Sequence, residues 1–294
     1  MAGHKSLRQI AAEERPLVTP VAHDALAARL IARAGFKAIA IGGSSMLAAR
    51  YGLPDLGLAA LGEMVDGARE IVAATDLPCI IDADDGYGDV KSVARTMELY
   101  QRLGVAAIIL EDQARDAKQP GDAKARGLVP EAIVEQKIAA AGAARSDPDL
   151  LIIARTDSYG VEGLDGALRR GERYLKAGAD GIFIPAIAKP EEIERAGAAF
   201  RGTYQMIVMS EGGKTPWLSP GELHGMGYSQ VAYPSYVVLR SVLAIESALA
   251  DLKSIAQGRK SPVAWPDYDR ARAVFQDAVR QQQWEEFELR HGRA

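Results

Sequence analysis

The sequence has very little cysteine, with Cys79 the only one among 294 residues. A single thiol can form neither an intrachain disulfide nor a cysteine-based zinc site, so both kinds of scaffold are excluded. The polar N-terminal stretch MAGHKSLRQIAAEERP lacks the apolar segment of a signal peptide. No run of about 18 uncharged apolar residues occurs, so a membrane span is not expected. We therefore expect a cytoplasmic protein.

The sequence also lacks an excess of positive charge. It has 35 Lys and Arg against 39 Asp and Glu, which gives a net charge of -4. Without surplus cations the chain has little with which to neutralise phosphates, so nucleic acid and acidic membranes are poor candidates as partners. Hydrophobic residues make up 48% of the chain, which is enough for a large core. A small-molecule partner is the better expectation.

Eight short apolar runs recur along the chain. Most are continuous rather than alternating, as in parallel strands that are buried on both faces. The runs are LVTPV at 17, AIAIGG at 38, PCIIDAD at 78, AAIILED at 106, LLIIARTD at 150, GIFIPA at 181, YQMIVM at 204 and QVAYP at 230.

Segments of helical period lie between several of these runs, and several end in a glycine that introduces the next strand, as in RAGFKAIAI and RLGVAAIIL. Alternating strands and helices predict an α/β fold. The pattern favours a (β/α)8 TIM barrel over a doubly wound open sheet. We place the barrel at residues 1–260 and a C-terminal helical extension at 261–294, in which 268–291 is predicted to be helical and to pack on a neighbouring subunit.

Charged residues gather where the predicted strands end. Asp82 and Asp84 follow the third strand, Glu111 the fourth and Arg155 the fifth, and Asp55 follows the second. In a parallel barrel these ends share one face, which carries the functional residues. Oxygen ligands of this kind suit a hard divalent ion, Mg2+ or Mn2+. A guanidinium such as that of Arg155 suits a substrate carboxylate.

Spacing refines this interpretation. Asp82 and Asp84 are two apart, so on a strand both would point to the same side and Asp85 would point away. Asp85 and Asp89 are better explained as residues of a capped turn before the next helix. Glu111 has an alternative role as the buried ion-pair partner of Arg155. The segment EGGKT at 211–215 is no phosphate-binding loop, because its first glycine would have to be Val208.

Six stretches in this order resemble the isocitrate lyase and phosphoenolpyruvate mutase superfamily, in particular its short members such as methylisocitrate lyase, dimethylmalate lyase and carboxyphosphonoenolpyruvate phosphonomutase. They are YGLPDLG, DADDGYGD, LEDQ, IARTD, AGADGIF and EGGKTPWL. The resemblance implies a (β/α)8 barrel whose last helix is exchanged between subunits of a dimer within a tetramer. It also implies chemistry through an enolate of a 2-oxo acid or related carboxylate.

The resemblance assigns roles to individual residues. Mg2+ would be held by Asp82, Asp84 and Glu111, largely by way of water, with Asp55 near the substrate. The substrate itself would meet Gly43, Ser44, Ser45, Arg155 and Glu211.

The sequence departs from the lyase pattern where the leaving group is handled. In the loop after the fourth strand Lys118 is retained, but Pro120 replaces the acid cysteine and Asp122 replaces a histidine. Pro185 stands in place of a glutamate and Val208 in place of an asparagine, so both are expected to line the substrate site. Lys118 and Asp122 are the candidate catalytic residues on this loop.

These changes favour a reaction that needs few proton-transfer partners. The leading hypothesis is a Mg2+-dependent carbon-carbon lyase that acts on a small 2-oxo or 2-hydroxy dicarboxylate, with oxaloacetate decarboxylation as the specific case. Phosphonomutase or phosphonopyruvate hydrolase chemistry is the first alternative. A barrel that binds an oxo acid without turnover is the second.

Overall fold

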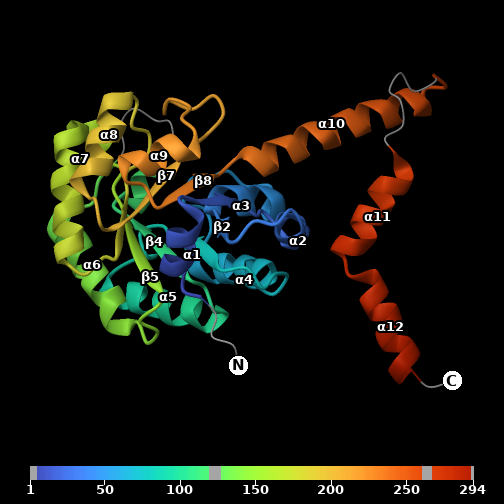
Figure 1. The fold of residues 1–294 in the computed structure, drawn as a ribbon, viewed down its shortest axis with the longest axis horizontal. Coiled ribbons are helices and arrows are strands. Elements are labelled where there is room, and N and C mark those ends of the chain that lie inside the picture. Colours follow the sequence, from blue (N-terminus) through green and yellow to red (C-terminus); the bar gives the residue numbers. More distant parts are fainter. Residues whose placement is uncertain (1–4, 119–126, 260–266, 293–294) are drawn as a thin grey trace.

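A computed structural model of the chain describes residues 5–118, 127–259 and 267–292. Eight parallel strands form one sheet in the order β1-β8-β7-β6-β5-β4-β3-β2, and a bridge between Val21 and Ala40 links its two edges. The predicted (β/α)8 barrel is confirmed (Figure 1). The strands are β1 (Leu17–Pro20), β2 (Ile39–Ile41), β3 (Cys79–Asp82), β4 (Ala107–Glu111), β5 (Leu151–Arg155), β6 (Gly181–Phe183), β7 (Tyr204–Val208) and β8 (Gln230–Tyr233).

Helices connect the strands, and those between β1 and β8 cover the outside of the barrel (Figure 1). The helices of the described residues are α1 (Leu7–Glu14), α2 (Ala25–Arg33), α3 (Gly43–Tyr51), α4 (Leu61–Val72), α5 (Val90–Leu103), the short 3-10 helix η1 (Arg115–Ala117), α6 (Glu131–Ala144), α7 (Tyr159–Lys176), α8 (Pro190–Ala199), α9 (Pro220–Met226), α10 (Tyr236–Ala256), α11 (Tyr268–Ala278) and α12 (Gln281–His291). Within the described residues, none of these helices is long and apolar enough to cross a membrane.

The helix ends follow local sequence signals. Asp89 caps α5 by accepting hydrogen bonds from the backbone N–H groups of Lys91 and Ser92, as the sequence predicts. Gly104 ends the same helix with a φ of 79°, a left-handed conformation that glycine adopts without strain. These caps fix where each helix stops and therefore where each strand enters the barrel.

Two apolar layers hold the barrel together. The larger one lies between the sheet and the surrounding helices, and the smaller one includes alternate strand residues such as Ile80, Ile153 and Met206 inside the barrel. Helix α1 contributes Leu7 and Ala11 to the inner layer. Since α1 thereby closes the amino end of the barrel, the carboxyl end is where a ligand can enter.

The C-terminal part of the chain is helical. Helix α10 extends away from the barrel and has no buried residue (Figure 1). The predicted helical segment at 268–291 is present as two helices, α11 and α12, which are separated at Arg280, where φ is a left-handed 56°. Helix α11 returns to the barrel surface, where Arg29 Nη1 donates to the carbonyl of Ala278 at 3.1 Å. The expected domain boundary at 260 falls among residues 260–266, which are outside the described part.

Candidate active site at the carboxyl end of the barrel

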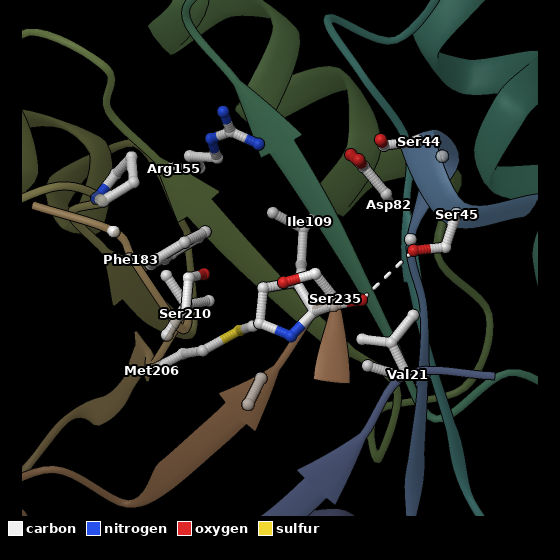
Figure 2. A pocket seen from close by; sticks show the side chains of 18 of the residues that line it. Val21, Ser44, Ser45, Asp82, Ile109, Arg155, Phe183, Met206, Ser210 and Ser235 are labelled. Atoms are coloured by element: carbon white, nitrogen blue, oxygen red, sulfur yellow. Dashed lines mark hydrogen bonds between the residues drawn. The ribbon is translucent and has the colours of Figure 1, made fainter. Parts of the chain in front are cut away.

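A cavity of about 450 Å³ opens at the carboxyl ends of the strands. Its lining comes from segments throughout the barrel, and Figure 2 shows how the side chains are distributed around it. The lining residues include Gly43, Ser44, Ser45, Asp55, Asp82, Ile109, Arg155, Phe183, Pro185, Met206, Val208, Lys214, Thr215, Pro234 and Ser235.

Asp82 is the last residue of β3 and faces this cavity. Burial, together with the negative charges of Asp84 and Glu111, raises the pKa of Asp82 to about 7. Asp84 does not continue the strand, which corrects the expectation from two-residue spacing. It adopts a left-handed φ of 46°, and its backbone N–H donates to Asp82 Oδ1 at 3.2 Å. A turn, rather than strand alternation, brings the two carboxylates together.

Lys118 places its ammonium group among the predicted acidic residues. Its Nζ lies 3.2 Å from Asp55 Oδ1 and 3.4 Å from Glu111 Oε1, and it also contacts Asp84 Oδ1. Burial lowers the pKa of Lys118, but the surrounding carboxylates outweigh burial and raise it. Lys118 is therefore a protonated cation that holds residues from three separate chain segments together.

Glu111 and Arg155 are register partners on β4 and β5. Glu111 Oε2 lies 3.1 Å from Arg155 Nη1, yet it is buried and makes no hydrogen bond within the described residues. Arg155 Nη2 donates to Asp157 Oδ1 at 2.8 Å. The ion pair that the sequence offered as an alternative for Glu111 is thus present. Because the ion-paired oxygen Glu111 Oε2 makes no hydrogen bond within the described residues, it can still accept a further cationic or hydrogen-donating partner.

The first turn of α3 forms another part of the lining, with Gly43, Ser44 and Ser45. Ser45 Oγ donates to the carbonyl of Pro234 at 3.1 Å, which ties α3 to the segment after β8. A side chain on Gly43 would begin 3.5 Å from Asp82 Oδ2. The helix start is thus held beside Asp82, where its unpaired N–H groups favour an anion.

Two supporting interactions were not anticipated from the sequence. Arg115 Nη1 donates to Asp84 Oδ2 at 3.2 Å, and the same guanidinium reaches the carbonyls of the segment before α4. Asp85 lies in the turn before α5, as predicted, where its Oδ1 accepts from the backbone N–H of Tyr87 at 3.1 Å, and its Oδ2 forms an unpredicted buried ion pair with Lys137 Nζ at 3.1 Å. No local motif predicts the contacts of Arg115 and Lys137, since each contact spans at least 31 residues of sequence.

The opposite wall of the cavity is apolar. Phe183 and Met206 lie across from Asp82 and Ser45 in Figure 2. Arg155 pairs with Phe183 in the β5–β6 register, and Phe183 pairs with Met206 in the β6–β7 register. The three side chains therefore point into the barrel at one level. This register cannot be determined from one sequence, so Phe183 and Met206 were not predicted to line the cavity.

Pro185 and Val208 complete the same wall, in the place expected of them. Glu211, expected near the substrate, is exposed and binds Arg240 through two hydrogen bonds of 2.6 and 2.7 Å. Residues 213–215 from its loop do line the cavity. Asp122 lies outside the described residues.

The sequence profile of the phosphoenolpyruvate phosphomutase family matches residues 7–253. The chain belongs to this family. It is 38% identical over 266 residues to 2,3-dimethylmalate lyase of Eubacterium barkeri, with 90% of this chain and 91% of that protein covered.

The structure of an oxaloacetate acetylhydrolase in complex with 3,3-difluorooxalacetate superposes with a TM-score of 0.88 at 28% identity, over 98% of this chain and 97% of that one. A phosphonopyruvate hydrolase complex with oxalate and Mg2+ gives a TM-score of 0.82 at 27% identity, over 98% of both chains. On the basis of these relatives, the chain is a carbon-carbon lyase of the isocitrate lyase and phosphoenolpyruvate mutase superfamily.

Proposed function

We propose that the cavity cleaves a carbon-carbon bond in a small 2-oxo or 2-hydroxy dicarboxylate through an enolate, with oxaloacetate decarboxylation as the leading case. The observation that carries this proposal is the division of the cavity. Asp82 and the start of α3 occupy one side, and Phe183 and Met206 occupy the other beside Arg155 and Ser210, and the described lining residues include no histidine or cysteine. Such a site can stabilise negative charge on an oxygen, but it offers little for acid-base work on the leaving group.

The donor set suits a divalent cation. Burial, together with the negative charges of Asp84 and Glu111, raises the pKa of Asp82, and Glu111 Oε2 makes no hydrogen bond within the described residues although it lies 3.1 Å from Arg155 Nη1. Within residues 5–118, 127–259 and 267–292, no three acidic, histidine or cysteine side chains are placed to hold one ion directly. We therefore infer Mg2+ or Mn2+ binding to Asp82, Asp84 and Glu111 largely by way of water. When bound, the ion supplies charge neutralisation for the developing enolate oxygen.

The chain's own groups are proposed to bind and orient the substrate. N–H groups at the start of α3, at Gly43, Ser44 and Ser45, receive the carboxylate or oxyanion of the substrate. Arg155 binds a second carboxylate, and Glu111 and Asp157 fix the orientation of its guanidinium.

The apolar wall favours the loss of carbon dioxide. The scissile carboxylate is charged before cleavage and leaves as a neutral molecule, so its departure is easier where water is excluded. A proton from water then completes the product. Asp55 is proposed to act near the substrate. Lys118 is proposed to hold Asp55 in place, and Asp122 remains a candidate proton donor.

The experiment is incubation of purified protein with Mg2+ and oxaloacetate, with pyruvate measured against a metal-only background. Pyruvate above that background supports the proposal, and its absence removes the decarboxylation case. The phosphonopyruvate hydrolase likeness and the cavity position of Lys214 and Thr215 favour phosphorus-carbon chemistry as second candidate. Phosphorus NMR of phosphonopyruvate mixtures detects that reaction. Oxalate binding without turnover of any acid would identify a binding protein.

We also propose that α10 packs on a second copy of the chain, as an exchanged helix in a dimer of dimers. Its exposed apolar side chains include Leu239, Val242, Leu243, Ile245, Leu249, Leu252 and Ile255. A monomer rarely leaves so many large apolar residues of one helix in water. A cytoplasmic location also remains a prediction.

A further inference from the structure

Arg115 joins three chain segments that meet beside the cavity. It is the first residue of η1, the short helix after β4. Its Nη1 donates to Asp84 Oδ2 at 3.2 Å, in the turn after β3. Its Nη2 donates to the carbonyl of Gly57 at 3.3 Å and also to the carbonyl of Ala59. Both carbonyls belong to the segment between α3 and α4, which carries Asp55.

That segment has little else to hold its middle part. Residues 52–60 contain neither helix nor strand. Leu56 and Leu58 are 43% and 57% exposed, so burial of their side chains contributes little to fixing the backbone. Lys118 Nζ lies 3.2 Å from Asp55 Oδ1, but a contact at the end of one side chain does not fix the backbone that carries it.

The segment and η1 also approach each other closely at Gly57. This glycine has a left-handed φ of 73°. A Cβ at this position would lie 3.2 Å from the carbonyl oxygen of Arg115 and 3.5 Å from its Cγ. A side chain here would therefore strain the backbone and push the segment away from Arg115.

Asp84 is held in place independently of Arg115. Its N–H donates to Asp82 Oδ1 at 3.2 Å, and its carbonyl accepts from the N–H of Glu111 at 2.8 Å. Its Oδ1 contacts Lys118. Loss of the Arg115 guanidinium would leave Asp84 with these contacts, whereas the segment between α3 and α4 would lose both carbonyl hydrogen bonds.

We propose that Arg115 is a positioning residue that fixes Asp55 relative to the carboxylates beside the cavity, with Asp84 as its anchor. Arg115 is not among the residues that line the cavity, whereas Asp55 is. Arg115 therefore acts through Asp55 and not by contact with the substrate. This inference deepens the proposed function and rests on it, because Asp55 is proposed to act near the substrate.

The turnover test uses Arg115→Met, which removes the guanidinium and keeps an unbranched side chain. With Mg2+ and oxaloacetate, kcat should fall about 30-fold, because a displaced group slows the reaction of a substrate that still binds. KM should stay within about 2-fold of the native value. Gly57→Ala, which displaces the same segment without removing a charge, should show the same pattern. Arg69→Met is the matched control, since Arg69 is exposed and pairs with Asp66 on α4.

Calorimetry with oxalate and Mg2+ shows whether the rest of the site is intact. Arg115→Met should bind one oxalate per chain with an affinity within about 3-fold of the native protein, because Arg115 contacts neither Arg155 nor the start of α3. The lower kcat then belongs to folded, metal-competent sites. A native kcat for Arg115→Met would overturn the inference. Loss of oxalate binding in proportion to the loss of kcat would also overturn it, because Arg115 would then act through the metal site.

A spin label separates this inference from the proposed reaction. Leu58 is exposed on the segment between α3 and α4, while Cys79, the only native cysteine, is 2% exposed, so a nitroxide on Leu58→Cys reports on that segment. Arg115→Met should sharpen the lines of its EPR spectrum, because the segment moves faster, and Arg69→Met should not. Sharper lines in a protein that turns over no oxaloacetate would mean that only the proposed reaction fails. An unchanged spectrum in Arg115→Met would overturn the positioning role whatever the turnover.

Discussion

Glu111 and Arg155 face each other across the β4–β5 pair, with Glu111 Oε2 lying 3.1 Å from Arg155 Nη1. Their ion pair joins the acidic side of the cavity to the side that would receive a substrate carboxylate. Arg155 also donates to Asp157, so one guanidinium is shared by two buried acids. Its planar fork can satisfy several acceptors at once, which a lysine ammonium cannot do in the same geometry.

Arg155→Lys is therefore expected to lower kcat/KM for oxaloacetate by about 10²-fold, because the charge remains but the fork geometry is lost. Steady-state kinetics checks this value, and circular dichroism checks the fold. Arg169→Lys is the matched control, since Arg169 is exposed and meets Glu131 and Glu162 on the outer helices. A native rate for Arg155→Lys would remove Arg155 from the substrate site.

Lys118 occupies the space between carboxylates that are expected to bind the metal. Lys118→Met keeps an unbranched side chain one atom shorter and removes its charge, so Mg2+ should bind about 10-fold more tightly in the absence of substrate. Lys118→Arg keeps the charge and should bind Mg2+ about as weakly as the native protein. Isothermal titration with Mg2+ measures both variants. Unchanged or weaker binding by Lys118→Met would show that the lysine does not oppose the ion.

The raised pKa of Asp82 predicts that the stability of the metal-free protein depends on pH. Its folded-state pKa is raised from 3.8 to about 7, so the folded chain holds this proton more tightly than the unfolded chain. The stability that Asp82 contributes is therefore present at low pH and is lost as the pH rises through about 7. Thermal unfolding in EDTA should show this loss, and Asp82→Asn should show less of it.

Saturating Mg2+ should reverse that trend, because an ionised carboxylate is the form that supports the ion. Melting temperatures with and without Mg2+ across the same pH range provide the comparison. If the native protein and Asp82→Asn have the same pH profile in EDTA, Asp82 is not the group responsible.

The exposed face of α10 predicts an assembled protein. The pair Leu243→Asp and Leu249→Asp places charge within the apolar face and should reduce the molecular mass measured by light scattering. Ser247→Asp is a control at an exposed position on the polar side of the same helix. A native mass for the double variant, or a native protein that is already monomeric, would contradict the proposed exchange of α10.

The barrel was accessible from sequence because strand burial and helix periodicity are local patterns, repeated eight times. Strand ends also located Asp82, Glu111 and Arg155 at one face. The turn at Asp84 was missed, since nothing local distinguishes a left-handed aspartate from one on a strand. The break between α11 and α12 was also missed, since nothing local distinguishes a left-handed arginine at position 280 from one inside a helix.

The apolar wall shows a second limit of prediction from a single sequence. Pro185 and Val208 could be named because they depart from a family pattern. Phe183 and Met206 required the register of neighbouring strands, which depends on how the whole barrel closes. The hydrogen bond from Arg115 to Asp84 joins residues that are 31 positions apart in the sequence, and no local spacing rule predicts it.

The account depends most on a divalent ion that acts beside Asp82 on a bound keto acid. Calorimetric titration with oxalate, a planar mimic of the pyruvate enolate, tests this directly. We predict one oxalate per chain in the presence of Mg2+, and no measurable binding in EDTA or in Asp82→Asn. Oxalate binding of equal strength with and without Mg2+ would contradict the central claim.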